Sequence, residues 1–284
     1  LPGKLSVGGV LTLKIMRHLI DVDRVQRIDF GIGDEDYKSK WMSHRRERWR
    51  IMAYNRRSPK GALLSSRCLM AQYVSCIVDG GMEADDVELH CLPLYHCAQL
   101  DCFLSVDFYL GATSILLRAP DPGKILETIE SERVTKLFCP PTVWISLLRH
   151  PDFDKRDLSS LVKGYYGASI MPTAVIEELL QRLPGLRLWN FYGQTEMAPM
   201  ATVLKPQDQL RKLGSAGVPA VNVETRVVDD DDNDVPVGEV GEIVHRSPQA
   251  MLGYFEDEAK TAEAFRNGWF HSGDLGRFDE DGYL

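Results

Sequence analysis

From residue 59 onward, apolar segments alternate with segments of helical spacing, and this alternation limits the chain to few folds. Strands are predicted at 87–96, 135–141, 161–169 and 186–193. Helices are predicted at 63–80, 122–134, 142–149 and 172–184, and the segment 105–117 is predicted as a helix that ends at Gly111 and continues as a strand. Strands that alternate with helices of this length build a parallel sheet flanked by helices. We therefore expect an α/β domain over residues 59–213.

The pattern changes near residue 214, where the helices are predicted to stop. Short strands are expected around 223–229, 241–247 and 268–279, separated by turns rich in Asp, Asn and Gly. The acidic run at 229–232 lacks the ligand order of a calcium loop, so we interpret it as a turn exposed to water. Residues 214–284 therefore predict a small β-rich subdomain.

Residues 1–58 differ in composition from the rest of the chain. A helix at 6–20 and strands at 25–31 and 47–54 predict a short α+β appendage. Residues 1–60 carry 14 Lys and Arg against 7 Asp and Glu, whereas the remainder of the chain is acidic. Such an arm could bind nucleic acid. Because the arginines at 45–50 share their stretch with Trp41 and Trp49, we favour a solvated strand edge and expect no nucleic-acid partner.

The cysteines and the absence of long apolar runs indicate the compartment. No apolar run reaches the roughly 18–20 residues that a membrane span needs, so we expect no transmembrane segment. The His-Cys pairs at 90–91 and 96–97 lack the spacing of a structural zinc site. We expect buried free thiols and a cytoplasmic location. The six cysteines are Cys68, Cys76, Cys91, Cys97, Cys102 and Cys139.

The segment LWNFYGQTEMAP (188–199) carries the strongest chemical signal. A strand delivers Tyr192, a glycine turn follows, and Thr195 and Glu196 come next. This order offers a flat ring for a base, a hydroxyl for phosphate oxygens and a carboxylate for Mg²⁺, at the edge where α/β sheets bind ligands. Taken alone, the segment is also compatible with an ordinary turn whose threonine caps a helix.

Three further segments strengthen the nucleotide interpretation. In GWFHSGDLGRFDEDGYL (268–284), Asp274 lies between two glycines, where a carboxylate could bind ribose hydroxyls or simply occupy a β-turn. Together with GASIMP (167–172) and VGEVGEIVHRSPQAMLGYF (237–255), these motifs give residues 59–284 a close resemblance to the adenylate-forming superfamily, specifically to bacterial fatty-acyl-CoA synthetases. The resemblance implies a truncated large domain of that superfamily.

The resemblance also implies roles for individual residues. Tyr192 would stack on adenine and Asp274 would bind the ribose. Thr195 would contact the phosphates and Glu196 would hold Mg²⁺, which makes these two the catalytic residues. His96 would border the acyl tunnel, although a core histidine bonded to backbone explains it equally well. The remaining nucleotide-binding residues would be Gly167, Ala168, Ser169, Asn190, Gly193 and Gln194.

Members of this superfamily catalyse a reaction in two steps, and the resemblance implies the same substrates here. A fatty or aryl carboxylate attacks the α-phosphate of MgATP, which gives an acyl-adenylate and pyrophosphate. The thiol of coenzyme A then displaces AMP. Catalysis is mainly electrostatic, because cations and backbone N–H groups neutralise the charge that develops on the phosphates.

The phosphate-binding loop of the superfamily is not recognisable in this chain. SPKGALLSS (58–66) would follow a loop of the form TSGTTG, but AYNRRS (53–58) occupies that place. Glycines let the backbone approach phosphate closely, and loss of one preorganised donor typically costs about 10²–10³ in rate. A C-terminal domain with a further lysine would lie beyond Leu284. We therefore expect impaired or absent turnover.

The segment 27–54 explains the missing loop. It resembles the last part of another family, the GNAT-like acetyltransferases associated with cellulose biosynthesis. We interpret the chain as a junction of two partial genes near Ser58. Two alternatives remain at this point, an acetyltransferase-related fragment and a non-catalytic fusion remnant. A truncated domain would expose an apolar face, so we also expect self-association.

Overall fold

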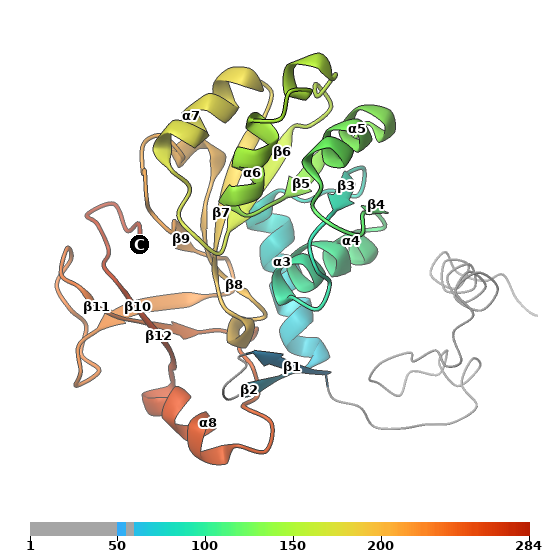
Figure 1. The fold of residues 1–284 in the computed structure, drawn as a ribbon. Coiled ribbons are helices and arrows are strands. Elements are labelled where there is room, and N and C mark those ends of the chain that lie inside the picture. Colours follow the sequence, from blue (N-terminus) through green and yellow to red (C-terminus); the bar gives the residue numbers. More distant parts are fainter. Residues whose placement is uncertain (1–49, 55–59) are drawn as a thin grey trace, which may run out of the picture. The chain divides into compact units, whose positions relative to one another are not determined.

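The computed structural model describes residues 50–54 and 60–284 (Figure 1). The elements predicted at 6–20 and 25–31 lie outside the described residues. Strands β1 (Arg50–Tyr54) and β2 (Lys60–Leu64) form an antiparallel pair in which Tyr54 is opposite Lys60. Residues 60–64 are therefore a strand, which corrects the predicted start of the helix at 63. Helix α3 (Ser66–Gly80) begins at Ser66 because the side chain of Ser65 accepts a hydrogen bond from the Cys68 backbone N–H.

The main sheet has seven strands in the order β4-β3-β5-β6-β7-β8-β9. Their bounds are β3 (Val87–His90), β4 (Thr113–Leu116), β5 (Lys136–Phe138), β6 (Lys163–Gly167), β7 (Arg187–Gly193), β8 (Met200–Leu204) and β9 (Val218–Pro219). The first five strands in this order are parallel, as predicted, whereas β8 and β9 are antiparallel to their neighbours. The sheet is therefore mixed. The connection 194–199 between β7 and β8 is too short for the crossover that a parallel pair needs.

Helices cover both faces of this sheet. One face packs against α5 (Pro122–Glu132), α6 (Pro141–Leu148) and α7 (Thr173–Arg182), in a core that includes Trp144 and Leu179. The other face packs against α3, the π-helix η1 (Ala98–Leu104) and α4 (Ser105–Leu110), around Phe103 and Tyr165. The π-helix was not predicted, and the strand predicted at 87–96 ends at His90.

A second, three-stranded antiparallel sheet follows in the order β10-β11-β12, as the β-rich prediction requires. Its strands are β10 (Glu224–Val228), β11 (Gly241–Arg246) and β12 (Phe270–Gly276). The acidic run forms an exposed turn after β10, in which Asp229 accepts hydrogen bonds from the backbone N–H groups of Asp231 and Asn233. Helix α8 (Glu258–Ala264) corrects the expectation that helices stop near 214. Short 3₁₀ turns occupy Phe153–Lys155, Thr195–Met197, Pro206–Asp208 and Arg266–Gly268.

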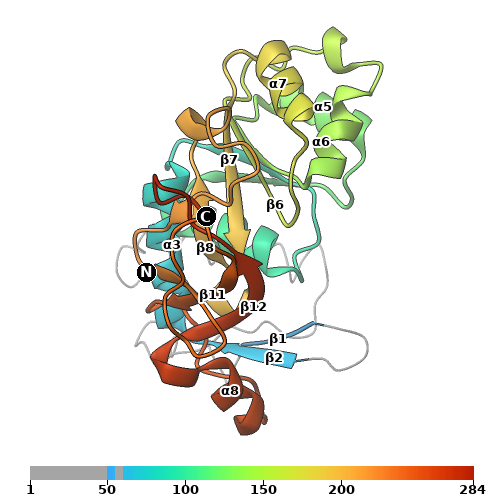
Figure 2. The same cartoon turned by 90° about the vertical axis from the view of Figure 1, so that its left-hand side faces the viewer.

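The small sheet lies between the two ends of the described unit. Figure 2 shows α5, α6 and α7 at one end, and α8 with the β1–β2 hairpin at the other. The hairpin is attached to the segment after β11, because Leu63 donates its N–H to the Gly253 carbonyl at 2.9 Å and Phe255 donates to the Gly61 carbonyl at 2.7 Å. These bonds fix β2 beside residues 252–255.

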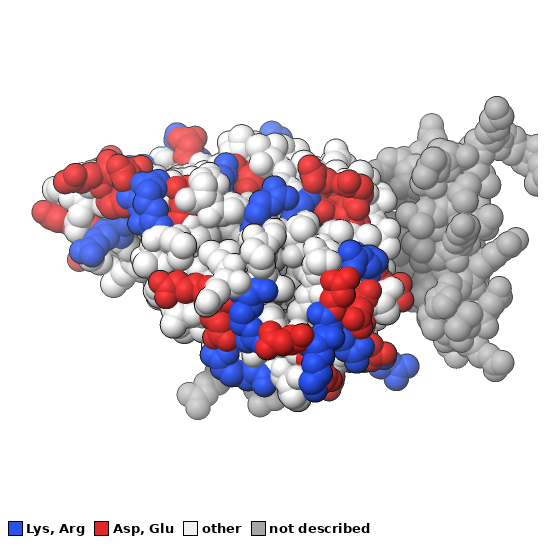
Figure 3. Space-filling view, turned by 90° about the horizontal axis from the view of Figure 1, so that it is seen from above, with Lys and Arg blue, Asp and Glu red and all other residues white. Residues whose placement is uncertain are grey.

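Basic and acidic side chains are intermingled on the face that carries α5 to α7 (Figure 3). Several of them form ion pairs, including Arg133 with Asp157, Arg149 with Glu178 and Arg156 with Glu130. This face therefore lacks the single-sign charge of a nucleic-acid surface. Among the described residues, no helix combines the length and the apolar composition that crossing a membrane requires.

Candidate functional site

The carboxyl ends of the central strands bring the sequence motifs together. Strand β6 ends at Gly167 and the neighbouring parallel strand β7 ends at Gly193, with Gly167 paired to Phe191. A Cβ at position 167 would lie 2.5 Å from the Phe191 carbonyl oxygen, so only glycine permits this close approach. Next to it, Ala168 has φ 64°, which turns the chain sharply away from the sheet. The residues that follow both strands therefore face a common edge.

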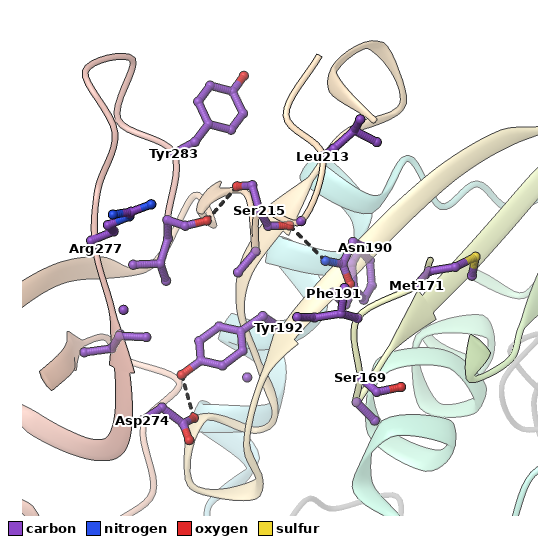
Figure 4. Close-up of a pocket in the computed structure, with 18 of the residues that line it drawn as sticks. Ser169, Met171, Asn190, Phe191, Tyr192, Leu213, Ser215, Asp274, Arg277 and Tyr283 are labelled. Carbon is purple, nitrogen blue, oxygen red and sulfur yellow. Dashed lines mark hydrogen bonds between the residues drawn. The ribbon is translucent and has the colours of Figure 1, made fainter. Parts of the chain in front are cut away.

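A first cavity of about 700 Å³ opens at this edge (Figure 4). Its walls come from the ends of β6 and β7, from residues 213–216 and from the segment after β12. The Tyr192 hydroxyl donates a hydrogen bond to Asp274 Oδ2 at 2.8 Å, which joins the main sheet to the small one. Asn190 Nδ2 donates to the Ser215 carbonyl at 3.1 Å. The predicted residues that line this cavity are Ala168, Ser169, Asn190, Tyr192, Gly193 and Asp274.

The electrostatics of this cavity favour a neutral tyrosine beside a carboxylate. Burial raises the pKa of Tyr192, and the hydrogen bond to Asp274 and the charge of that carboxylate raise it further. The phenol therefore stays protonated at neutral pH and donates to Asp274. The carboxylate of Asp274 is exposed at the cavity surface, so it can accept hydrogen bonds from a ligand as well.

A second cavity of about 330 Å³ adjoins the first. It is apolar on the side of Phe103, Phe138 and Phe191, where the rings of Phe103 and Phe138 stack with centroids 4.5 Å apart. Its polar side carries the turn after β7. The predicted residues that line it are His96, Gly167, Ala168, Tyr192, Gly193, Gln194, Thr195 and Glu196.

The polar residues of the second cavity are held from outside the motif that carries them. Thr195 Oγ1 lies 3.2 Å from the Cys97 thiol. The Tyr254 hydroxyl donates to Glu196 Oε1 at 2.8 Å, and the Met251 N–H donates to the Glu196 carbonyl at 2.7 Å. Burial raises the pKa of Tyr254, and the charge of Glu196 raises it further, so this phenol also remains a donor. Glu196 is thus fixed by the segment that β2 contacts.

His96 and Gln194 offer further polar groups. The His96 Nδ1 accepts a hydrogen bond from the Ala98 N–H at 3.2 Å, and partial burial lowers the pKa of this imidazole, so the ring is neutral at pH 7. The Gln194 side-chain amide nitrogen is buried, and no hydrogen-bond partner for it occurs among the described residues. Because an unpaired buried amide is costly, this donor is available for a ligand.

The two cavities meet at four shared residues, Ala168, Phe191, Tyr192 and Gly193. All eleven residues singled out from the sequence therefore line one cavity or both. Sequence reasoning missed Tyr254 and Cys97, although Tyr254 lies within the motif 237–255 and Cys97 directly follows His96. It also missed the phenylalanine walls. Phe103 and Phe138 lie in apolar segments that look like ordinary core.

The donor set at this junction fits a magnesium nucleotide. Mg²⁺ prefers one or two carboxylates combined with substrate phosphates, and Glu196 supplies one carboxylate. Another cluster of possible metal ligands is fully buried and consists of Glu88, His90 and Asp107. The ammonium of Lys136 already lies 2.7 Å from Glu88 and 2.5 Å from Asp107, so a cation occupies that cluster.

Sequence comparisons relate the chain to known proteins. The AMP-binding enzyme family matches residues 58–255, and an acetyltransferase (GNAT) domain family matches residues 3–39. Feruloyl-CoA synthase of Amycolatopsis sp. is 39% identical over 226 residues, which are 80% of this chain and 46% of that protein. Indoleacetate–CoA ligase of Aromatoleum aromaticum is 38% identical over 80% of this chain and 44% of its own length. The chain therefore spans about half the length of these relatives.

Solved structures agree with the sequence comparisons. The N-terminal domain of FACL13 from Mycobacterium tuberculosis superimposes with a TM-score of 0.76 and 29% identity, over 82% of this chain and 58% of that one. O-succinylbenzoate Coenzyme A synthetase from Bacillus subtilis, solved in complex with AMP, superimposes with a TM-score of 0.73 and 29% identity, over 82% and 48%.

Proposed function

Because the chain belongs to the AMP-binding enzyme family, we propose that its first cavity binds the adenosine part of a nucleotide and its second cavity binds the acyl part of a carboxylic acid. The observation that supports this assignment is the junction of the cavities at Ala168, Phe191, Tyr192 and Gly193. A carboxylate from one side and an α-phosphate from the other would meet there. Such positioning lowers the barrier to reaction by converting a bimolecular step into a unimolecular one.

In this proposal each predicted residue acts on the group nearest to it. The Tyr192 ring stacks on adenine, and Asp274 accepts hydrogen bonds from the ribose hydroxyls. Ser169, Asn190 and the backbone at 167–168 border the base. Thr195 contacts the phosphates, and the amide of Gln194 donates to the carboxyl or phosphate oxygens at the junction. His96 borders the acid.

Glu196 would hold Mg²⁺, which would neutralise negative charge on the phosphates when bound. The Tyr254 hydroxyl donates a hydrogen bond to this carboxylate and orients it. Supporting residues of this kind fix a metal-binding carboxylate in one direction. Replacing Tyr254 would therefore weaken binding of the magnesium nucleotide more than binding of AMP.

The reaction we propose is the formation of an acyl-CoA from a carboxylic acid, ATP and coenzyme A. A carboxylate oxygen attacks the α-phosphorus, the new C–O–P bond forms and pyrophosphate leaves. The thiol of coenzyme A then attacks the acyl carbon, the C–S bond forms and AMP leaves. The phenylalanine walls and the compact volume of the second cavity favour an aryl acid over a long fatty chain.

We further propose that the chain binds the triphosphate of ATP weakly. The five residues between β1 and β2, Asn55 to Pro59, contain no glycine and lie outside the described residues. Strand β2, which follows these five residues, lies close to the proposed site of reaction. It is hydrogen-bonded to residues 252–255, and Tyr254 of that segment donates to Glu196. Without glycine, side chains limit how closely the backbone N–H groups of such a segment can approach phosphate. Low turnover follows.

The test is calorimetric titration of the purified chain with AMP and with a non-hydrolysable aroyl-sulfamoyl adenosine. We expect the analogue to bind more tightly than AMP, because it fills both cavities. Tyr192→Ala should weaken both ligands roughly tenfold through loss of stacking. Tyr109→Ala, at an exposed tyrosine that lines neither cavity, is the matched control. If the parent chain binds neither ligand, the assignment of the two cavities to the nucleotide and the acid is wrong.

Two further features support proposals about the environment of the chain. Met70, Val74 and Val78 are 41%, 41% and 58% exposed and recur every four residues along α3, which favours self-association through this stripe. Sedimentation velocity at several concentrations measures this self-association, and Val74→Lys should keep the chain monomeric. A sedimentation profile that Val74→Lys leaves unchanged argues against the stripe.

All six cysteines are free and buried, which favours a cytoplasmic location. Microscopy of a tagged chain in cells tests this location. The GNAT match carries no second proposal, because residues 3–39 lie outside the described residues.

A further inference from the structure

One wall of the second cavity is a π-helix. Ala98, Cys102 and Phe103 of η1 line this cavity, and η1 continues directly into α4 at Ser105. Helices with i→i+5 hydrogen bonds are rare and often occur at functional sites. Relaxation of η1 to an α-helix would rotate Cys102 and Phe103 around the helix axis and change the shape of the wall. Something must therefore hold η1 in this form.

The first turn of η1 is tied to the end of β3 by one side chain, Gln99. This residue is fully buried. Its Nε2 lies 2.8 Å from His90 Nδ1, and its Oε1 accepts a hydrogen bond from the Leu92 N–H at 3.4 Å. An amide nitrogen can only donate, so His90 Nδ1 accepts and the ring proton is on Nε2. Both ends of Gln99 are therefore used.

His90 links Gln99 to α4, because its other ring nitrogen contacts Asp107 of that helix. Its Nε2 lies 3.1 Å from Asp107 Oδ2, and a carboxylate can only accept, which agrees with the same tautomer. Asp107 also accepts from Ser114 Oγ at 3.2 Å and from Lys136 Nζ at 2.5 Å. The η1–α4 unit is thereby bonded to β3, β4 and β5.

A buried cation faces two buried carboxyl groups in this network. Burial acts to lower the pKa of Lys136, but the carboxyl groups of Glu88 and Asp107 raise it, so the ammonium stays protonated. Burial acts to raise the pKa of Asp107, but hydrogen bonds from His90 and Lys136 leave it lowered, whereas burial raises the pKa of Glu88. The Lys136 ammonium therefore lies beside the Asp107 carboxylate and the His90 imidazole, whose pKa burial lowers. Buried pairs of this kind are costly to break, so the network is rigid.

We propose that Gln99, acting through His90 and Asp107, is a positioning residue that holds the π-helix wall and so sets which acyl groups the second cavity accepts. The proposal rests on the proposed function for its assignment of that cavity to the acid. None of the described residues that line only the first cavity takes part in the network, so nucleotide binding is independent of it.

The test compares Gln99→Met with the parent chain by calorimetry, with AMP, an aroyl-sulfamoyl adenosine and an alkanoyl-sulfamoyl adenosine of similar length as ligands. Methionine keeps the length of the side chain and removes both hydrogen-bonding groups. We expect the affinity for AMP to stay within about twofold. The ratio of the affinities for the aroyl and the alkanoyl analogue should fall by about tenfold. The reason is that η1 would no longer hold Cys102 and Phe103 in the positions that shape the cavity wall.

Thr128→Val is the matched control for a general loss of stability. Thr128 is a buried residue of α5 whose hydroxyl donates to the Lys124 carbonyl at 2.7 Å, on the other face of the sheet. It should lower the melting temperature without changing the ligand preference. If Gln99→Met does not fold, Ser114→Ala removes one bond to Asp107 and should shift the preference in the same direction by a smaller factor.

The outcomes separate this inference from the function it rests on. An unchanged acyl preference in a folded Gln99→Met chain overturns the inference, as does an equal loss of AMP and analogue binding. Absence of any binding by the parent chain instead overturns the proposed function. A lowered preference with AMP binding intact supports both.

Discussion

At the residue scale, most of the motif residues line the cavities because they lie at or just after strand ends. Thr195 and Glu196 come two and three residues after Gly193, the last residue of β7, and Asp274 lies between two glycines within β12. Parallel strands bring their carboxyl ends to one edge, so the residues that follow β6 and β7 had to meet there, whereas Asp274 comes from the small antiparallel sheet. Their chemical roles remain predictions. The sequence could not reveal that Tyr254 holds Glu196, because that contact joins residues 58 positions apart.

His245 gives a prediction about pH. This histidine of β11 is fully buried, its Nδ1 lies 3.0 Å from Thr225 Oγ1, and among the described residues its Nε2 has no hydrogen-bond partner. Burial lowers its pKa to about 4. An unfolded histidine titrates near 6.5, so between these values the unfolded state binds more protons. Stability should therefore fall as the pH decreases through this window, by at most about 3 kcal/mol.

Urea unfolding of the parent chain and of His245→Leu at pH 7.5, 5.5 and 4.5 measures this contribution. The variant should lose less stability than the parent between pH 7.5 and 4.5, because it has no buried imidazole to protonate. Equal losses in the two proteins would show that the buried ring does not titrate as its surroundings indicate.

At the element scale, the turn between β7 and β8 decides where the motif residues lie. Gly193 has φ 157°, and a Cβ there would lie 1.9 Å from the Pro199 carbonyl oxygen. Gly193→Ala should therefore displace the turn that carries Thr195 and Glu196. We expect a loss of at least about tenfold in affinity for the aroyl-sulfamoyl adenosine, measured by calorimetry.

Gly185→Ala is the matched control for that substitution. A Cβ at this position, in the turn before β7, would meet nothing within 4 Å. It should bind the analogue like the parent chain. If Gly193→Ala also binds normally, the turn adapts and the close approach at 193 is not required for the site.

Two of the elements that the sequence did not predict, β8 and the π-helix, share a cause. Strand β8 follows a motif, and the π-helix lies in a segment that looks like ordinary apolar core. Neither element has a pattern of apolar residues with a period that distinguishes it from its surroundings. Helix α8 begins at Glu258 because Asp257 accepts from the Lys260 N–H, a local signal that could have been recognised. By contrast, the boundaries of α5 follow from its Asp121 cap and Pro122.

At the scale of the whole molecule, we expect the residues between β1 and β2 to control how tightly the proposed nucleotide site binds a triphosphate. Tyr54 and Lys60 are paired, so a replacement of equal length keeps the hairpin register. Substituting glycine, serine and threonine for Asn55, Arg56 and Arg57 should let the backbone N–H groups approach phosphate more closely. We expect the affinity for MgATP to increase about tenfold while that for AMP stays constant, measured by calorimetry.

An alanine graft of the same length separates backbone donors from charge. It removes both arginines without adding glycine, and it should not improve binding of MgATP. If both grafts change the affinity for MgATP equally, the arginines rather than the backbone control triphosphate binding. If neither graft changes it, this segment does not limit triphosphate binding, and either result shows that the proposed reason for low turnover is wrong.

The sequence by itself determined the α/β class and the β-rich region, because side-chain period and turn residues are local properties, and its resemblance to the adenylate-forming superfamily singled out the eleven residues that line the two cavities. The tertiary structure alone decided that β8 runs antiparallel, that a π-helix forms one cavity wall and that two cavities share Tyr192. It also placed Asp274 against Tyr192 and Cys97 against Thr195, residues 82 and 98 positions apart. Such contacts depend on how layers pack, and no local pattern encodes them.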